Sequence, residues 1–161
     1  MGTAEGPQWA LGGDTFVVGC ALPASAVFPQ FNETNLDAQD DRYASDLGIY
    51  EPQCGLDNLR IAYGHDEYLF QMLLANKTTI PPQGLAMVRF HSCYPWHTGG
   101  EYRQFMTPHD HEMLPWVLEF NKQDLYTKDD HAALSQADVE ALWPYYEGLL
   151  AKYIPDPNMI W

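Results

Sequence analysis

Three polar residues fall where the apolar faces of helical segments would otherwise continue, namely His65, His91 and Asp124. His65 shares a helical face with Ala62, Leu69 and Met72, and His91 with Leu85 and Val88. Asp124 shares one with Met113, Val117 and Phe120. Each polar side chain is therefore expected to point inward. Because an unpaired carboxylate or imidazole is costly to bury, we expect the three to converge on a shared partner, and their types favour a metal ion.

The residue types leave the identity of this metal open. Two histidines and a carboxylate are a ligand set of non-haem iron, but imidazole also binds zinc, copper and nickel. The spacings from His65 to His91 and on to Asp124 form no short local motif. The alternative for each histidine alone is a core residue whose ring is hydrogen-bonded to a backbone carbonyl.

Composition limits the kinds of partner. A chain of 161 residues fits a single domain, 1–161, with one core. The net charge of −14 excludes nucleic acid and anionic membrane as expected partners and favours a small neutral substrate. Three irregularly spaced cysteines without a C-x-x-C motif indicate a reducing compartment, and we expect a cytoplasmic protein. MGTAEGPQWALGG has no apolar signal region, and no window is long and apolar enough for a membrane span.

The elements that must position these residues are distributed unevenly. Residues 1–55 are rich in turn signals and are expected to be loops, apart from a short strand at 16–18. Residues 56–161 are expected to be helical, which makes the fold class all-α. The predicted helices are 56–76, 82–94, 107–126 and 135–153, and Pro144 should kink or restart the last one. Thr107 with Asp110 and Ser135 with Asp138 are expected to cap two helix starts. A loop-rich run this long usually wraps another part of a protein.

Six segments in order resemble the C-terminal half of the myo-inositol oxygenase family, from about Gly6 to Trp161. They are GPQWALGGDTFVVGC, RYASDLGIY, CGLDNLRIAYGHDEY, RFHSCYPWHTG, LPWVLEFNKQDLYTK and PYYEGLLAKY. The resemblance implies an HD-domain-like helical bundle and an oxidoreductase that incorporates oxygen. Its reaction would be the ring-opening oxidation of myo-inositol by O₂ to D-glucuronate at a mixed-valent pair of iron ions. His65 and His91 would then ligate one iron, and Asp124 the other.

The resemblance also implies a set of substrate contacts, which comprises Gly13, Asp14, His91, Ser92 and Lys128. A neutral polyol must be recognised by hydrogen bonds, with Asp14 accepting them and Lys128 and the Gly13 backbone donating them. Lys128 would also act in catalysis by offsetting the negative charge of a bound alkoxide. The alternative for Lys128 is a cation favoured by the dipole at the C-terminal end of a helix.

The sequence also departs from the family pattern. The family's upstream histidine, its metal-bridging His-Asp pair and a further substrate lysine have no counterpart here, so we expect a truncated portion with half of the site. Asp66 is expected off the inward face, His109 and His111 in a solvated first turn, and His97 and His131 at the surface or in loops.

Three functional interpretations remain open. The first is an inositol oxygenase portion, and the alternative is a catalytically inactive remnant or an interaction or metal-binding module. An HD-type phosphohydrolase is disfavoured by the GGDT and LYTK segments. Helix partners absent from this sequence would leave Leu69, Met72, Trp116 and Phe120 exposed, so self-association through apolar surface is expected.

Overall fold

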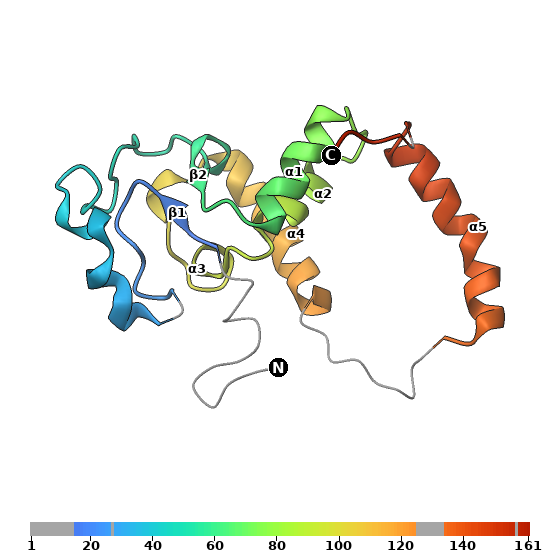
Figure 1. The fold of residues 1–161 in the computed structure, drawn as a ribbon, viewed down its shortest axis with the longest axis horizontal. Helices are drawn as coiled ribbons and strands as arrows, with labels where there is room; N and C mark the ends of the chain where they lie inside the picture. The colour runs from blue at the N-terminus through green and yellow to red at the C-terminus, as the bar shows by residue number, and fades with distance from the viewer. Residues whose placement is uncertain (1–14, 27, 125–133, 157) are drawn as a thin grey trace.

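A computed structural model describes residues 15–26, 28–124, 134–156 and 158–161. The α-helices are α1 (His65–Ala75), α2 (Pro82–Phe90), α3 (Tyr94–His97), α4 (Pro108–Asp124) and α5 (Gln136–Tyr153) (Figure 1). The two strands are β1 (Val17–Val18) and β2 (Arg60–Ile61). Short 3₁₀ helices are η2 (Pro29–Thr34), η3 (Leu36–Gln39), η4 (Leu56–Asn58) and η5 (Arg103–Phe105). The mainly helical content confirms the predicted all-α class.

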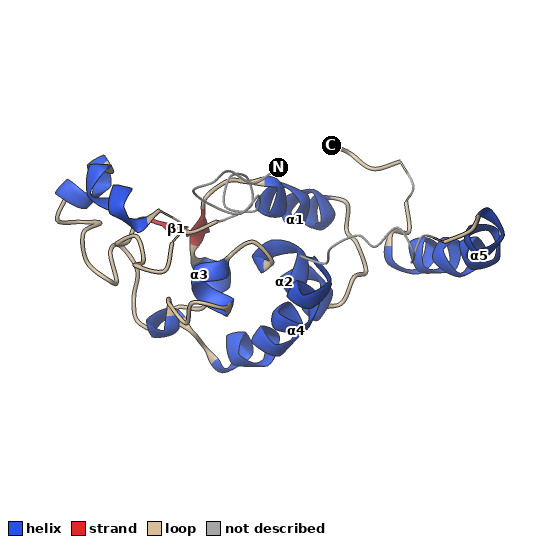
Figure 2. Cartoon of the chain, turned by 90° about the horizontal axis from the view of Figure 1, so that it is seen from below, coloured by secondary structure: helices blue, strands red, loops and turns tan. Residues whose placement is uncertain are grey.

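The helical body is formed by α1, α2 and α4, with α3 beside them. Helix α2 packs against both α1 and α4, and Figure 2 shows these three helices side by side. The core beneath them contains Trp96 and Phe105, which are fully buried, together with Leu56, Val17 and Val117. Burial of one such side chain stabilises the fold by roughly 1.5–3 kcal/mol. The same core includes Phe90 at the C-terminal end of α2 and Ile61 in β2, the strand that precedes α1.

A two-stranded ribbon joins the loop-rich segment to this body. Strands β1 and β2 are antiparallel, with Val17 opposite Ile61 and Val18 opposite Arg60. The Val17 backbone N–H donates to the Tyr102 hydroxyl at 3.1 Å, which anchors β1 over the core. The predicted short strand at 16–18 is thus confirmed for Val17 and Val18.

The predicted helices differ most from the structure at residues 56–64, which include η4 and β2. The helix expected over 56–76 begins only at His65, because Leu56–Asn58 forms η4 and Arg60–Ile61 pairs with β1. The helix expected over 82–94 ends at Phe90, and α3 follows as a separate turn. Tertiary strand pairing therefore overrides the helical periodicity of residues 56–64.

Both predicted capping pairs are present. The Thr107 hydroxyl donates to the Asp110 carboxylate at 2.7 Å, and Ser135 and Asp138 form a reciprocal capping box at the start of α5. Helix α5 runs through Pro144 without a restart. Among the helices of the described ranges, none combines the length and apolar character that crossing a bilayer requires.

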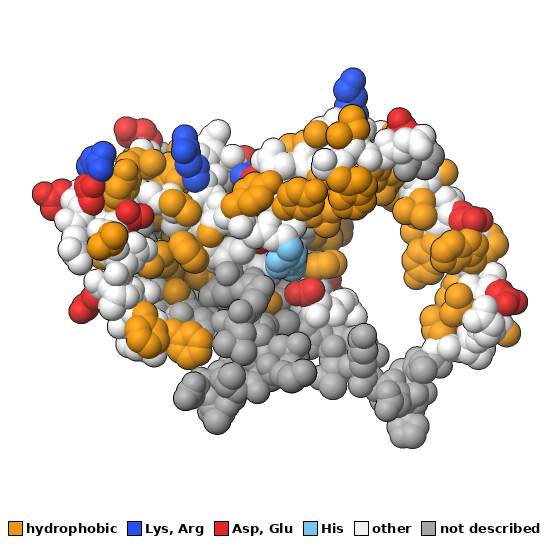
Figure 3. Space-filling view, in the orientation of Figure 1, with side chains coloured by type: hydrophobic (Ala, Val, Ile, Leu, Met, Phe, Trp, Pro, Cys, Tyr) orange, Lys and Arg blue, Asp and Glu red, His pale blue; other side chains and the backbone are white. Residues whose placement is uncertain are grey.

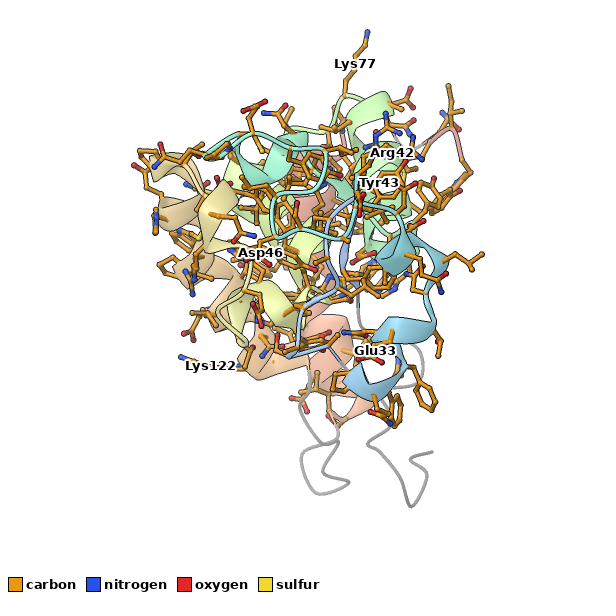
Figure 4. The ribbon with its side chains drawn as sticks, turned by 90° about the vertical axis from the view of Figure 1, so that its left-hand side faces the viewer. Glu33, Arg42, Tyr43, Asp46, Lys77 and Lys122 are labelled. Carbon is orange, nitrogen blue, oxygen red and sulfur yellow. The ribbon has the colours of Figure 1, made fainter. Side chains whose placement is uncertain are left out.

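The loop-rich segment and α5 lie on opposite sides of the helical body (Figure 1). In the loop-rich segment, the Arg42 guanidinium lies 4.9 Å from the centre of the Tyr43 ring, and the two side chains are adjacent in Figure 4. Helix α5 contains no buried residue and stands apart from the body, with open space between them in Figure 3. It is attached at its C-terminal end, where the Thr79 backbone N–H donates to the Tyr153 carbonyl at 2.9 Å.

Candidate metal site

Two of the three predicted ligands lie together between the ends of two helices. His65 is the first residue of α1, and His91 caps the C-terminal end of α2. Their Nε2 atoms are 3.0 Å apart, and the rings meet edge to face with centroids at 5.0 Å. The packing of α1 on α2 therefore brings together two imidazoles that are 26 residues apart in the sequence.

The orientation of His91 fits a metal ligand. Its Nδ1 lies 2.8 Å from the Val88 carbonyl oxygen, which can only accept, so Nδ1 carries the proton and Nε2 keeps its lone pair. Two imidazole nitrogens that each lie about 2.1 Å from one ion, at a right angle, are separated by about 3 Å. The observed separation of the two Nε2 atoms matches that arrangement, so this pair fits two ligands of a single ion.

Ser92 lies directly beside the histidine pair. Its side chain is buried, and its hydroxyl oxygen is 3.5 Å from the Nε2 atom of His65. A hydroxyl here can donate a hydrogen bond to an oxygen bound next to the two imidazoles, or accept one from it.

Asp124, the third predicted ligand, is the last residue of α4 and is exposed. Within the described part of the chain, no three His, Cys, Asp or Glu side chains come close enough to hold one metal ion. The end of α4 is nevertheless near the pair, since the Phe120 ring, one turn before Asp124, lies 5.9 Å from the His91 ring. The structure thus brings two predicted ligands together and places the third on the adjoining helix end.

The burial pattern of α1 corrects the phase that was predicted from sequence. His65 is exposed rather than inward, whereas Asp66 is fully buried and Glu67 is 7% exposed. The helix begins at His65, so Ala62 does not contribute to its repeat. Both buried carboxylates have partners: Glu67 forms an ion pair with Arg89 at 2.7 Å, and Asp66 accepts from the Glu67 backbone N–H at 2.8 Å.

His97, predicted at the surface or in a loop, is in fact buried in α3. Its Nε2 donates to the His91 carbonyl at 2.9 Å, and the Thr98 hydroxyl donates to Nδ1 at 2.8 Å. Burial lowers the pKa of His97, while the His91 carbonyl and the charge of Asp124 act in the opposite direction. The sequence gives no signal for this residue, because its partners come from a turn that helical periodicity does not describe.

The remaining predicted positions fall into two groups. His109 and His111 are exposed in the first turn of α4, as predicted. Gly13, Asp14, Lys128 and His131 lie outside the described residues.

Comparison with known proteins identifies the family. The family model described as myo-inositol oxygenase matches residues 2–161. This chain belongs to the myo-inositol oxygenase family. It is 55% identical over 150 residues to mouse inositol oxygenase, 54% identical to the rat protein and 52% identical to the human protein.

The myo-inositol oxygenase match covers nearly all of this chain but not all of its relatives. In each of the three comparisons, 92% of this chain aligns with 51% of the relative. The chain therefore spans about half the length of the curated relatives it matches. His65, Ser92 and His91 all lie within the stretch matched by the family model.

Proposed function

We propose that the chain contributes the ligand pair and part of the substrate site of an inositol oxygenase, which converts myo-inositol and O₂ to D-glucuronate. His65 and His91 would ligate one iron of a two-iron site, and Asp124 the other. The observation that carries the proposal is the 3.0 Å separation of the two Nε2 atoms, together with the proton fixed on Nδ1 of His91. The match to relatives named inositol oxygenase supports this choice over other uses of a histidine pair.

The side chains around the pair would bind and orient the substrate. Iron held there supplies Lewis acidity for a bound hydroxyl and activates O₂. Ser92 would hydrogen-bond a hydroxyl next to the histidines, and Val88 would keep the His91 ring in place. Asp14 would accept hydrogen bonds from the polyol, the Gly13 backbone would donate them, and Lys128 would offset the charge of an alkoxide.

We further propose a reducing, cytoplasmic setting. Cys20 and Cys54 are free thiols. Burial, aided by the charge of Asp46, raises the pKa of Cys20 to about 11, so this thiol stays protonated and unreactive at neutral pH. Free thiols of this kind persist where disulfides do not form.

A metal titration tests the ligand pair. Co(II) binds imidazole and reports its coordination in the visible absorption spectrum, so we expect the intact chain to bind it. His65→Ala and His91→Ala should each abolish binding, because either leaves a single imidazole. The matched control is His109→Ala, an exposed histidine at the start of α4, which should leave the affinity unchanged. Loss of binding in the control alone would contradict the proposed site.

Oxygen consumption tests the catalytic part of the proposal. Two imidazoles and one carboxylate leave coordination positions of two iron ions open, so the chain with Fe(II) and a reductant should show no inositol-dependent O₂ uptake on its own. Addition of the remaining half of the mouse relative should restore some uptake. Turnover by the chain alone at a rate comparable to the full-length mouse relative would contradict this prediction.

A second candidate function is an interaction or metal-binding module without catalysis. The exposed apolar residues of α5, among them Leu142, Trp143 and Leu150, favour it. It predicts that the chain binds Co(II) but gives no O₂ uptake even when the other half of the mouse relative is supplied.

A further inference from the structure

We propose that Thr15 is a positioning residue that sets the separation of the His65 and His91 imidazoles. The inference rests on the proposed function of these two histidines as ligands. Thr15 forms two hydrogen bonds, each to the residue that follows one of the histidines. Its backbone N–H donates to the Ser92 carbonyl at 2.9 Å, and its hydroxyl donates to the Asp66 carboxylate at 3.3 Å. One buried residue thus connects the start of α1, through its side chain, to the end of α2, through its backbone.

The Thr15 hydroxyl is important because it donates to the buried Asp66 carboxylate. Asp66 is fully buried, and within the described ranges no Lys or Arg pairs with it. From the described residues, its carboxylate accepts hydrogen bonds from the Thr15 hydroxyl and from the Glu67 backbone N–H. A buried carboxylate is tolerated only when donors satisfy it. Loss of the hydroxyl would therefore leave Asp66 under-bonded and free the start of α1 to move.

The surroundings of Thr15 leave little room for such movement in the native protein. A Cβ atom built on Gly64 would lie 3.0 Å from Asp66 Oδ1 and 3.6 Å from Thr15 Cγ2. The Ala62 backbone N–H donates to the Phe16 carbonyl at 2.8 Å, so the segment before α1 is also bound to the residue that follows Thr15. Thr15 also follows Gly13 and Asp14 in the sequence, the two residues proposed to contact the substrate.

This connection bears on metal affinity because the two ligands come from different helices. His65 is exposed, and among the described residues its ring is within hydrogen-bond distance of His91 and Ser92 of the same site, so its position depends on where α1 starts. Loss of a residue that orients metal ligands typically reduces metal affinity by about 10-fold to 100-fold. Thr15→Val, which keeps the shape and the backbone N–H but removes the hydroxyl, is therefore expected to weaken Co(II) binding by at least about 10-fold.

Two further variants separate positioning from general stability. Thr15→Ser restores the hydroxyl and should bind Co(II) within about threefold of the unaltered chain, a small part of the expected loss. Thr107→Val is the matched control, because Thr107 also donates its hydroxyl to a buried aspartate, Asp110, at 2.7 Å. It lies 13 residues before Phe120 on α4, about 20 Å along the helix, and should lower thermal stability without changing Co(II) affinity.

The outcomes distinguish this inference from the proposed function. Equal Co(II) affinity in the unaltered chain, Thr15→Val and Thr15→Ser would overturn the positioning role and leave the histidine site standing. If His65→Ala binds Co(II) as tightly as the unaltered chain, the proposed ligand pair fails instead.

If the ligand pair fails in this way, the positioning role of Thr15 is tested by NMR, from the imidazole ¹⁵N resonances of the metal-free chain. Thr15→Val should shift those of His65 and His91 but not those of His109, and unchanged resonances would overturn it. Should Thr15→Val fail to fold, Asp66→Asn takes its place, since it keeps the size of the side chain and weakens the bond by removing the charge. Asp66→Asn should then reduce Co(II) affinity or shift the same resonances, and no change in either would overturn the inference.

Discussion

At the scale of single residues, the site is supported by buried charge as well as by apolar packing. Arg89, two residues before His91, is 6% exposed and forms ion pairs with Glu67 on α1 and Asp57 in η4. Its guanidinium also lies 4.6 Å from the centre of the Phe70 ring. Removal of one partner of a buried pair such as Arg89–Glu67 typically costs about 3–5 kcal/mol. Arg89 therefore holds α1 and α2 together next to the histidines.

His97 should make the stability of the chain depend on pH. Burial holds its pKa below the ordinary value of 6.5, so the unfolded chain takes up a proton at a higher pH than the folded chain does. Stability should therefore fall as the pH drops below 6.5 towards the lowered pKa, and this contribution should be constant above 6.5. Urea unfolding between pH 5 and pH 8 measures this slope.

The control for this prediction is His97→Gln, whose amide can still donate to the His91 carbonyl but does not titrate. The variant should lose part of the pH dependence over the same range. Identical slopes in the two proteins would show that His97 does not contribute.

The sequence predicted which histidines come together better than it predicted which side chains are buried. The structure brings His65 and His91 together, as the convergence argument expects, although His65 is exposed and Asp66 is buried. The helical phase was wrong because residues 56–64 form a 3₁₀ turn, a strand and a loop. The buried role of Glu67 depends on Arg89, a partner 22 residues away that no local pattern predicts.

At the scale of elements, local signals set where α4 and α5 start, whereas tertiary strand pairing delays the start of α1 to His65. The capping pairs at Thr107 and Ser135 were predictable because the bonds join residues three apart. The end of α2 at Phe90 was not predicted; α3 follows it as a separate turn, in which the His97 backbone N–H donates to the Cys93 carbonyl. The strand pairing of Ile61 with Val17 was also missed, because it joins segments 44 residues apart.

Helix α5 should unfold locally when its cap is removed. Ser135→Ala deletes a capping bond, which typically costs about 1 kcal/mol, and no α5 residue is buried to compensate. Hydrogen exchange of the first turn of α5 should accelerate roughly fivefold, whereas the amides of α2 should keep their rates. Acceleration of equal size in α2 would show that α5 and the body unfold as one unit.

At the scale of the whole molecule, apolar surface is concentrated on α5 and on the helix faces beside it. Figure 3 shows hydrophobic side chains on α5 and along α1, on both sides of the open space. Trp116, Phe120 and Leu69 are exposed by 49%, 37% and 36%, as predicted. Met72 was predicted to be exposed and is instead 7% exposed. Exposed apolar patches of this kind mark partner sites or cause aggregation.

The chain alone should therefore self-associate and bind the dye ANS. The mass measured by light scattering should rise with concentration, and Leu142→Gln with Leu150→Gln on α5 should reduce both effects. The matched control is Leu36→Gln in η3, a leucine that is 79% exposed but lies in the loop-rich segment. A monomer that melts in one sharp transition and binds no ANS would contradict this prediction.

The attachment of α5 also has a consequence for the entropy of the chain. The Asn76 side chain exchanges two hydrogen bonds of 2.8 Å with the backbone of Ile160, a residue 84 positions later. With the helical body folded, the loop that docking closes runs only from the end of α4 at Asp124 to Ile160, and its length-dependent cost is about 3 kcal/mol. The two Asn76 bonds and the three from Thr78 and Thr79 to the end of α5 return roughly 0.5–1.5 kcal/mol each. The bonds thus return about 2.5–7.5 kcal/mol against a loop cost of the same order, so the docked position of α5 should be favoured by only a few kcal/mol, and a contact with another surface can draw α5 away from it.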